Sequence, residues 1–383
     1  MSRSQWVFEA VDTLFFRDSR PMESVGGSEL ASGFPPPART LIGAIRTAIG
    51  DALGVDWQAY GAAEPGQHPV HAVMGTPGEL GPLRFTGPWI ARSGERLFPM
   101  PRNLLFKDDD AVRTAELLQT VLRPGAPAHC DLGVVRLPAK ARPLDGAKPL
   151  EDEFLTADGL HAYLQGKPVL RAQVVRRREL FEREGRLGIA LDHDRRTTGD
   201  GLLYQTEHVR PTAAQGLEMG ITLEGLDRAG LPAAGMARLG AEGRMAHWRC
   251  DAARPLPPAA VGPGAGVLLL LLGPARFAQG WLPDGFAPLT DALGVRQWRG
   301  RLHGVELLLH CAVVGRPQRE GGWDMAGGRP RELDNLVPAG SLYFCSAVDG
   351  DAAGAAAALH GRQIGMDTEW GRGELAVGGW TPA

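Results

Sequence analysis

The sequence predicts an α+β protein made of two units, and three observations support this prediction. Strand-like and helix-like segments occur on both sides of residue 251. The chain has 383 residues, 44% of them hydrophobic, which is enough for two cores. A Pro/Ala/Gly-rich stretch over Asp251–Gly266 is typical of a linker. We therefore expect one domain over residues 1–254 and a second over residues 255–383.

The first half begins with a predicted strand and a predicted helix. Residues 5–16 mix aromatic and β-branched side chains and end at the polar turn Arg17–Pro21, which favours a strand. Three prolines at 35–37 precede apolar residues at helical spacing, so we expect a helix over 38–53 that stops at Gly54. Further strands are predicted near residues 187–192, 202–210, 217–224 and 244–250.

The second half repeats this mixture. Apolar runs predict strands over 267–272, 304–314 and 341–348, and an Ala-rich segment predicts a helix over 351–360. Between the two predicted elements 38–53 and 187–192 lies a segment too long for a plain connection. We expect an insertion over about 54–185 that contains a short helix at 116–123.

Composition narrows the possible functions. The net charge of −3 and the pI near 6.4 lack the basic balance of a free-standing nucleic-acid binder. Arginine outnumbers lysine strongly, but a biased coding composition explains this as well as RNA binding does. The four cysteines include no CxxC pair, so we expect no zinc site and no cofactor. The amino terminus lacks a signal peptide and the longest aliphatic run is too short to span a bilayer, which predicts a cytoplasmic protein with no membrane partner.

The segment Val11–Gly50 crowds four arginines around one loop and the start of the predicted helix. The first turn of a helix offers unsatisfied N–H groups and a positive dipole end, which favour phosphate binding. An ordinary solvated helix end with surface arginines explains the pattern equally well. The candidate phosphate-binding residues are Arg17, Arg20, Arg39, Thr40 and Arg46.

A second basic region lies in the predicted insertion. Lys140 and Arg142 belong to a basic stretch, and Arg176, Arg177 and Arg178 form the sharpest charge cluster of the chain. We expect residues 130–180 to grip RNA or a partner subunit. The competing interpretation is a solvated strand edge, where charge blocks pairing with other sheets.

Several segments together resemble one known family. DTLFFRDSRP followed by FPPPARTLIGAIRTAIG resembles the amino-terminal signature of subunit three of the type III-B CRISPR Cmr effector complex, within the RAMP superfamily. Blocks similar to later parts of that family follow in order: residues 81–106, 186–211, 239–248, 337–345 and 370–380. The resemblance implies two ferredoxin-like (RAMP/RRM-like) domains, with long insertions and a C-terminal Gly-rich loop over 370–380.

The same resemblance implies a function. It indicates a non-catalytic RNA-binding subunit for antiviral defence, which holds the 5′ repeat-derived tag of the guide (CRISPR) RNA. Its implied protein partners are the large polymerase-like Cmr subunit and the backbone RAMP subunit of the filament. In the Gly-rich loop, the implied RNA contacts are Gly371, Arg372 and Gly373. Tyr204 is a candidate for stacking on an unpaired base, although burial explains an aromatic residue there at least as well.

The alternative is a metal-independent RAMP endoribonuclease that processes the guide RNA precursor. Such catalysis needs positioned acid and base side chains near the amino-terminal strand and helix. That region offers Asp12 and Asp18 but no histidine, since the first histidine of the chain is His68. A solvated turn explains Asp192-His193-Asp194 better than a metal or acid–base site does, because alternation along a strand separates the histidine from both carboxylates. We therefore expect no enzyme activity.

Overall fold

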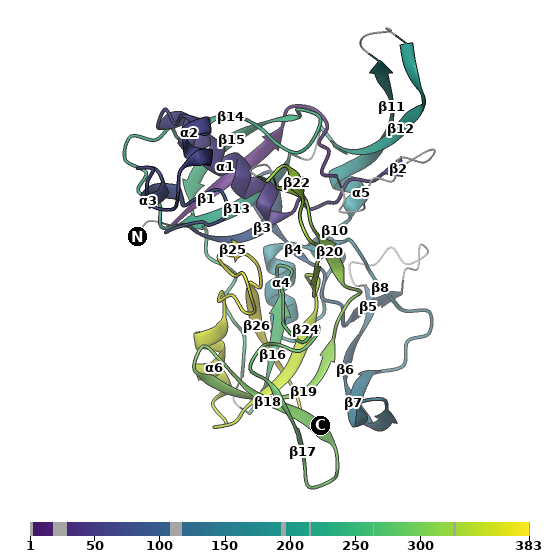
Figure 1. The fold of residues 1–383 in the computed structure, drawn as a ribbon. Coiled ribbons are helices and arrows are strands. Elements are labelled where there is room, and N and C mark those ends of the chain that lie inside the picture. The colour runs from purple at the N-terminus through teal and green to yellow at the C-terminus, as the bar shows by residue number, and fades with distance from the viewer. Residues whose placement is uncertain are drawn as a thin grey trace. The chain divides into compact units, whose positions relative to one another are not determined.

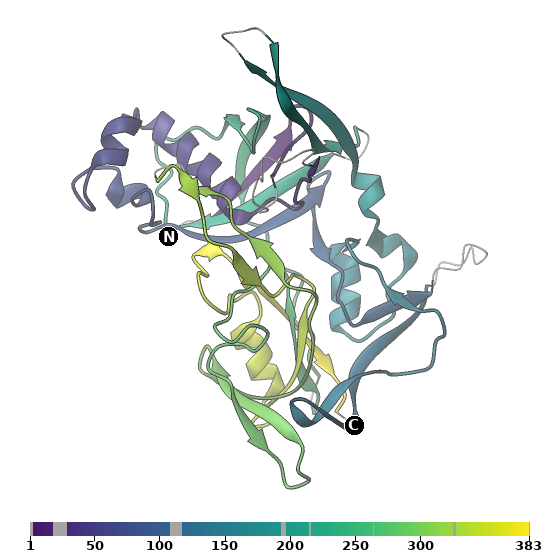
Figure 2. The same cartoon turned by 45° about the vertical axis from the view of Figure 1, so that its right-hand side comes forward.

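The structure is a computed structural model that describes residues 3–17, 29–107, 117–192, 197–213, 216–262, 264–324 and 327–382, with backbone alone for residues 29, 189–192 and 197–204. The chain forms two compact units (Figures 1 and 2). Unit 1 comprises Met1–Gly94, Arg178–Arg254 and Arg319–Asp334, and unit 2 comprises Glu95–Arg177, Pro255–Gln318 and Asn335–Ala383. The chain first enters unit 2 after residue 94 and enters it again after residues 254 and 334. Residues 95–177, expected within the first domain, belong to unit 2.

Unit 1 is built on an antiparallel sheet with the strand order β3-β13-β1-β15-β14. Strands β1 and β3 are parallel to each other because both are antiparallel to β13, which lies between them. Helix α1 lies between β1 and β3 in the chain, so these elements form a split βαβ unit. The strands are β1 (Arg3–Ala10), β3 (Arg84–Arg92), β13 (Leu217–Glu224), β14 (Ala234–Arg238) and β15 (Met245–Ala252).

Helix α1 (Ala38–Ala52) forms where the spacing of apolar residues predicts it. Its buried stripe includes Leu41, Ile45 and Ile49, each at most 1% exposed. Pro37 precedes the first turn and Gly54 follows the last with a φ of 68°, a left-handed conformation that glycine adopts without strain. Two short helices, α2 (Trp57–Ala62) and α3 (His71–Met74), follow α1 in unit 1.

A long antiparallel ribbon extends from unit 1 (Figures 1 and 2). It consists of β11 (Phe181–Asp192) and β12 (Thr197–Pro211), preceded by the single-turn helix α5 (Arg177–Leu180). The short strand β2 (Glu29–Leu30) pairs in parallel with β12 at the base of the ribbon. The sequence predicted strands near both positions but not their joint length.

Unit 2 contains a second antiparallel sheet, of order β17-β18-β19-β24-β16-β26. Strands β24 and β26 flank β16 and are joined through helix α6, which gives another split βαβ unit. These elements are β16 (Gly266–Leu271), β17 (Ala287–Thr290), β18 (Arg296–Leu302), β19 (Val305–Val313), β24 (Leu342–Ala347), α6 (Ala352–Leu359) and β26 (Leu375–Trp380).

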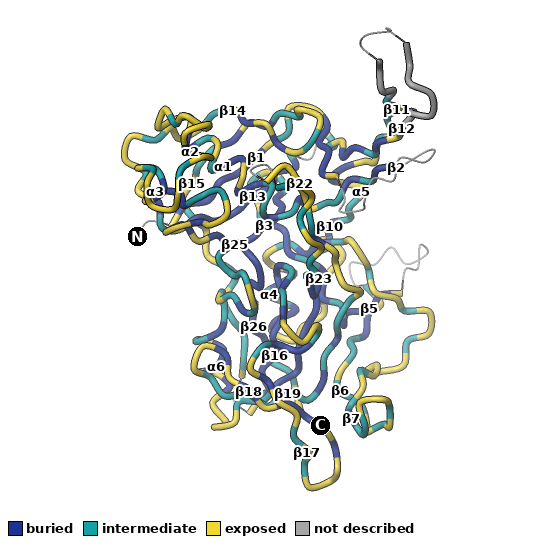
Figure 3. The backbone as a smooth tube through the Cα atoms, viewed as in Figure 1, coloured by how far each residue is buried: buried dark blue, intermediate teal, exposed yellow. Residues whose placement is uncertain are grey.

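The aliphatic run of β16 is explained by burial of both sheet faces. Leu269 and Leu271 pack in a cluster with the alanines of α6, whereas Leu268 and Leu270 pack in a cluster with α4 (Ala157–Leu164). A strand covered on both sides needs a continuous rather than an alternating apolar pattern. Figure 3 accordingly shows this strand as buried throughout.

The expected helix at 116–123 is wrong for its described residues. From residue 118 onward the chain forms β6 (Leu118–Cys130), which pairs with β5 (Leu104–Lys107) and β7 (Gly133–Lys140). Hydrogen bonding to two neighbouring strands outweighs the modest helix preference of this short segment. Gln119 secures the strand further, because its side-chain amide exchanges two hydrogen bonds with the backbone of Val169.

The remaining short elements complete the two units. They are β4 (Glu95–Pro99), β8 (Lys148–Pro149), β9 (Phe154–Leu155), η1 (Arg171–Gln173), β10 (Val174–Val175), β20 (Gln318–Glu320), β21 (Trp323–Asp324), β22 (Arg329–Pro330), β23 (Asp334–Leu336) and β25 (Trp370–Gly371). No helix among the described residues is long and apolar enough to cross a membrane.

The α+β class predicted from the sequence is confirmed, and the protein is rich in strands. A complete ferredoxin-like βαββαβ motif has two helical crossovers. Each unit has one helical crossover. The other connection contains no helix, as the fully described segments 225–244 of unit 1 and 272–304 of unit 2 show.

Candidate nucleic-acid interface

The connection between β1 and α1, residues 11–37, is called the first loop. Its start is attached to the base of the β11–β12 ribbon. Leu14 and Val209 exchange backbone hydrogen bonds of 2.9 and 2.8 Å, and Arg17 forms an isolated bridge with Ser32. Arg183 of the ribbon donates to the carbonyl oxygen of Ser32. The exposed Arg17 is therefore held beside a ribbon arginine that lies far from it in the sequence.

The two phenylalanines of this loop belong to the core. Phe15 and Phe16 are each 3% exposed, so neither presents its ring to a base. Phe15 stacks on the His208 ring at a centroid distance of 5.1 Å, and Phe34 packs on Phe181 at 4.6 Å. These rings anchor the described part of the loop to the ribbon.

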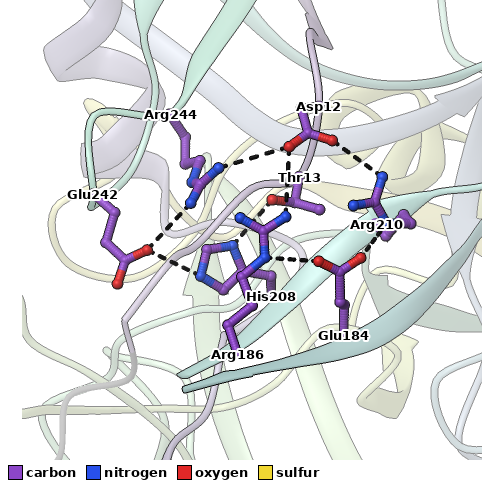
Figure 4. A network of polar contacts seen from close by, with 8 residues as sticks. All are labelled: Asp12, Thr13, Glu184, Arg186, His208, Arg210, Glu242 and Arg244. Atoms are coloured by element: carbon purple, nitrogen blue, oxygen red, sulfur yellow. Dashed lines mark hydrogen bonds and ion pairs between the residues drawn. The ribbon is translucent and has the colours of Figure 1, made fainter. Parts of the chain in front are cut away.

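Three arginines converge on Asp12 in a network of ion pairs (Figure 4). The nitrogen–oxygen distances are 3.0 Å from Arg210, 3.5 Å from Arg186 and 3.7 Å from Arg244. Glu184 of β11 accepts from both Arg186 and Arg210. The network joins β11 and β12 to the end of the first strand and to the turn before β15.

The carboxylates of this network are held in their ionised form. The guanidinium groups of Arg210 and Arg186 lower the pKa of Glu184 to about 2. The backbone N–H of Thr13 is the main cause of the lowered pKa of Asp12, with a further contribution from Arg210. The arginines are consequently paired with ionised carboxylates. Because Asp12 is about half exposed, the network is open to solvent.

His208 brings a histidine next to the first loop. Its side chain is fully buried, with Nδ1 3.1 Å from the Thr13 hydroxyl and Nε2 3.1 Å from Glu242. Burial lowers the pKa of His208, which favours the neutral ring. Sequence reasoning missed this residue because 195 positions separate it from Thr13.

Arg39 and Thr40 lie in the first turn of α1, as expected, and both are half-buried. That turn contains no acidic residue to compensate its positive dipole end. Arg20, also predicted here, lies outside the described residues. Arg17, Arg39 and Thr40 lie in the described part of the structure, and their contact with RNA remains a prediction.

Arg46 has a different environment from Arg39. Its guanidinium donates to the Tyr60 hydroxyl and to the carbonyl oxygen of Thr76, and burial lowers its pKa. The Tyr60 hydroxyl in turn donates to the Gly75 carbonyl at 3.0 Å. The predicted phosphate contact thus connects α1 to the segment around α2 and α3, two helical turns away from Arg39.

The basic residues of the expected insertion do not form one cluster around a loop. Lys140 donates to the Leu144 carbonyl at 2.8 Å and Arg142 to the Gln119 carbonyl at 3.1 Å, and both remain exposed. Arg176 and Arg177 are half-buried, Arg178 is exposed, and Arg177 and Arg178 begin α5. Arg177 and Arg178 thus lie in a helical turn, and Arg176 lies between β10 and α5.

The Gly-rich loop uses its glycines and its arginine in different ways. Gly371 and Gly373 have φ angles of 93° and 79°, and a Cβ on Gly373 would lie 2.0 Å from the Ile364 carbonyl oxygen. Arg372 is 2% exposed and pairs with Asp367 at 3.1 Å. Its guanidinium therefore supports the loop from within and is not presented at the surface.

The last candidates are a stacking contact at Tyr204 and a metal site. Tyr204 lies on β12, but its side chain is outside the described part of the structure. No group of three or more His, Cys, Asp or Glu side chains in the described residues is placed to hold a metal ion.

The ribbon residues were not singled out from the sequence. Arg183, Arg186 and Arg210 carry the charge at its base, and Arg244 joins them from the turn before β15. The sequence did offer one signal for them: Glu184 and Arg186 are two positions apart, so they lie on the same face of a strand. Alternation does not reveal the acidic partner, which comes from the first loop.

Comparison with known proteins identifies the family. A family model described as CRISPR-associated protein (Cas_Cmr3) matches residues 6–380. This match over nearly the whole chain makes it a CRISPR-associated protein. It belongs to the Cmr3 family, a RAMP-type subunit of type III-B Cmr complexes, which confirms the resemblance found in the sequence.

Solved structures are similar at low identity. A chain of "Cryo-EM structure of the Type III-B Cmr-beta bound to cognate target RNA" is 13% identical, with a TM-score of 0.48 and coverage of 89% of this chain and 86% of that chain. A chain of "Crystal structure of Csm3-Csm4 subcomplex in the type III-A CRISPR-Cas interference complex" is 9% identical, with a TM-score of 0.38 and coverage of 90% and 94%. No curated protein matches the sequence.

Proposed function

We propose that this chain is a non-catalytic RNA-binding subunit of a type III-B Cmr complex. It holds the 5′ repeat-derived tag of the guide RNA and docks the large polymerase-like subunit and the backbone RAMP subunit. The observation that carries the proposal is the family match over residues 6–380. We also propose that the two units are ferredoxin-like domains that have each kept one helical crossover.

The RNA surface that we propose combines the first loop with the base of the ribbon. Arg17 and Arg39 join Arg183, Arg186 and Arg210, which come from a distant part of the chain. Exposed ion pairs are each worth only about 0–1 kcal/mol, so phosphate groups can displace the carboxylates from these arginines. Arginine then binds phosphate through two parallel hydrogen bonds, which makes such an exchange favourable.

The other predicted contacts remain secondary proposals. Gly371 and Gly373 allow close approach of a backbone, while Arg372 positions the loop from the interior. Lys140 and Arg142 are exposed and offer a further basic zone, as does the cluster at Arg176–Arg178.

The ribonuclease alternative gains a histidine from the tertiary structure, but a poorly suited one. A general acid or base has to reach the proton that it transfers. The His208 side chain is fully buried and contacts Thr13 and Glu242 on its two nitrogens. This environment supports a structural role and favours the RNA-holding function.

One experiment separates the two functions. The purified chain is incubated in EDTA with guide RNA precursor that contains the repeat, and both cleavage and protection of the 5′ tag are measured. We expect protection without cleavage, and reduced protection after the double substitution Arg17→Gln and Arg39→Gln. Each lost phosphate contact on single-stranded RNA lowers the salt slope of log K by about 0.7, so the double variant should lose about 1.4. Site-specific cleavage would contradict the proposal.

A further inference from the structure

One face of the unit 1 sheet carries a hollow of about 460 Å³ over β1, β15 and β14. Two rows of paired residues form it, because residues directly opposite in neighbouring strands share a face. One row joins Val7 to Arg249 and Arg249 to Ala234, and the other joins Glu9 to His247 and His247 to Met236. Met236 is 54% exposed, so the hollow has an apolar wall open to solvent.

The charges beside this hollow do not balance. Glu9 lies directly opposite Glu218 of β13. Arg249 donates to Glu218 at 2.8 Å and to Asp251 at 2.9 Å, and it is the cation that lines the hollow. Three carboxylates therefore face one guanidinium. The next cation on β14 is Arg238, two residues beyond the hollow.

Two of these carboxylates have unused acceptor capacity. Glu218 is 8% exposed, and its second oxygen, Oε2, is buried without a hydrogen-bond partner. Glu9 is exposed and forms no ion pair within the described residues. Like charges directly opposite in an antiparallel pair are destabilising, and a buried acceptor without a donor is costly. A cation beside Glu9 would relieve the repulsion between the two glutamates.

We infer that this hollow is a docking site for an arginine or lysine side chain of a protein partner. The aliphatic stem of that side chain packs along Val7 and Ala234 against Met236, and its cation reaches Glu9. Long cationic side chains combine an apolar stem with a charged head in this way. The excess negative charge repels RNA, so the occupant is a protein.

This inference rests on the proposed assembly role but not on the proposed RNA contacts. The hollow uses none of the arginines assigned to guide RNA. A variant that loses the partner but still protects the RNA tag therefore supports the inference alone. A variant that loses tag protection with a complete set of subunits contradicts only the proposed RNA surface.

The first test uses the isolated full chain with methionine methyl groups labelled by ¹³C. N-acetylarginine methylamide is titrated in, and we expect the Met236 methyl resonance to shift. Glu9→Gln should remove this shift, whereas Glu64→Gln, which changes an exposed glutamate in the loop after α2, should leave it unchanged. Equal shifts in both variants, or a Met236 shift produced by a short RNA and not by the arginine derivative, would overturn the inference.

The second test uses the complex assembled from co-expressed subunits and purified through this chain. Removing one partner of a desolvated charge pair typically weakens an interface by about 30-fold or more. We expect Glu9→Arg to release a protein subunit at lower salt than the wild type, while Glu64→Arg behaves as the wild type. Circular dichroism and RNA affinity of the isolated Glu9→Arg chain serve as folding controls. Identical subunit composition and identical salt-induced dissociation for the two variants would refute the docking site.

Discussion

Replacing each of two arginines of helix α1 by methionine should change different properties, stability in one case and RNA affinity in the other. Arg46 donates to Tyr60 and to the Thr76 carbonyl, whereas Arg39 lies in the first turn of α1. Methionine keeps most of the apolar stem and removes the charged head. Arg46→Met should therefore lower stability with little effect on RNA, whereas Arg39→Met should weaken RNA binding.

The expected magnitude for Arg46→Met follows from its partners. Hydrogen bonds from charged donors are worth about 1.5–3 kcal/mol each, and losing them leaves acceptors unsatisfied. Tyr60 retains its bond to the Gly75 carbonyl, so most of the loss falls on the carbonyl of Thr76. We expect unfolding free energy to fall by about 2–3 kcal/mol, which corresponds to a decrease in Tm of about 5–10 °C for a unit of this size.

The assay compares thermal unfolding and RNA affinity for the same two variants. Trp57 packs edge-on against Tyr60 at 5.6 Å, so it contributes a signal from this region to the fluorescence of the nine tryptophans. For Arg39→Met we expect a salt slope reduced by about 0.7, because one phosphate contact is lost. If Arg46→Met weakens RNA binding as much as Arg39→Met does and leaves the Tm unchanged, the structural role assigned to Arg46 is refuted.

Four further predictions concern other parts of the chain. Gly373→Ala should destabilise the Gly-rich loop by more than about 1 kcal/mol in urea unfolding, because the new Cβ would lie 2.0 Å from a carbonyl oxygen; an unchanged midpoint would argue against this conformation. Glu184 has a native pKa of about 2, below its usual 4.5, so it adds stability above pH 4.5 that is lost as the pH falls toward 2. Glu184→Gln should flatten acid unfolding in that window, and an unaltered acid profile would contradict the ion pairs seen here. The pKa of His208 is lowered in the folded chain, so the unfolded chain binds a proton on this ring more readily and stability should fall as the pH drops below 6.5. His208→Gln should weaken this pH dependence in urea titrations at several pH values. An equally steep dependence in the variant would show that His208 is not its source. Glu9→Gln should raise the unfolding free energy by about 0.2–1 kcal/mol by removing a like-charge pair, and a loss of stability would count against that repulsion.

Elements with strong local signals could be predicted from the sequence. Helix α1 begins after three prolines and buries a regular apolar stripe, so its bounds of 38–52 differ from the predicted 38–53 by one residue. Strand β16 was equally clear because both of its faces are covered and its composition is uniformly aliphatic. Strand β6 was missed because its conformation depends on pairing with β5 and β7 rather than on local preference.

The candidate site could be predicted only in part for a related reason. Arg17, Arg39 and Thr40 were found because a loop and a helix start lie close together in the sequence. Arg186 and Arg210 could not be connected to that loop, since their shared partner Asp12 is more than 170 residues away. The burial of Arg372 was not foreseen either, because a Gly-rich segment gives no information about whether its side chains face outward.

By itself, the sequence determined the family, the mixed α+β class and the elements whose apolar spacing is strictly local. Only the tertiary structure decided which charged side chains are used inside the protein and which remain at its surface. The physical reason is that helix spacing and turn chemistry act over a few residues, whereas ion pairing and burial depend on which strands become neighbours. On helix α1 this difference makes Arg46 a structural residue, while Arg39 stays a proposed RNA contact.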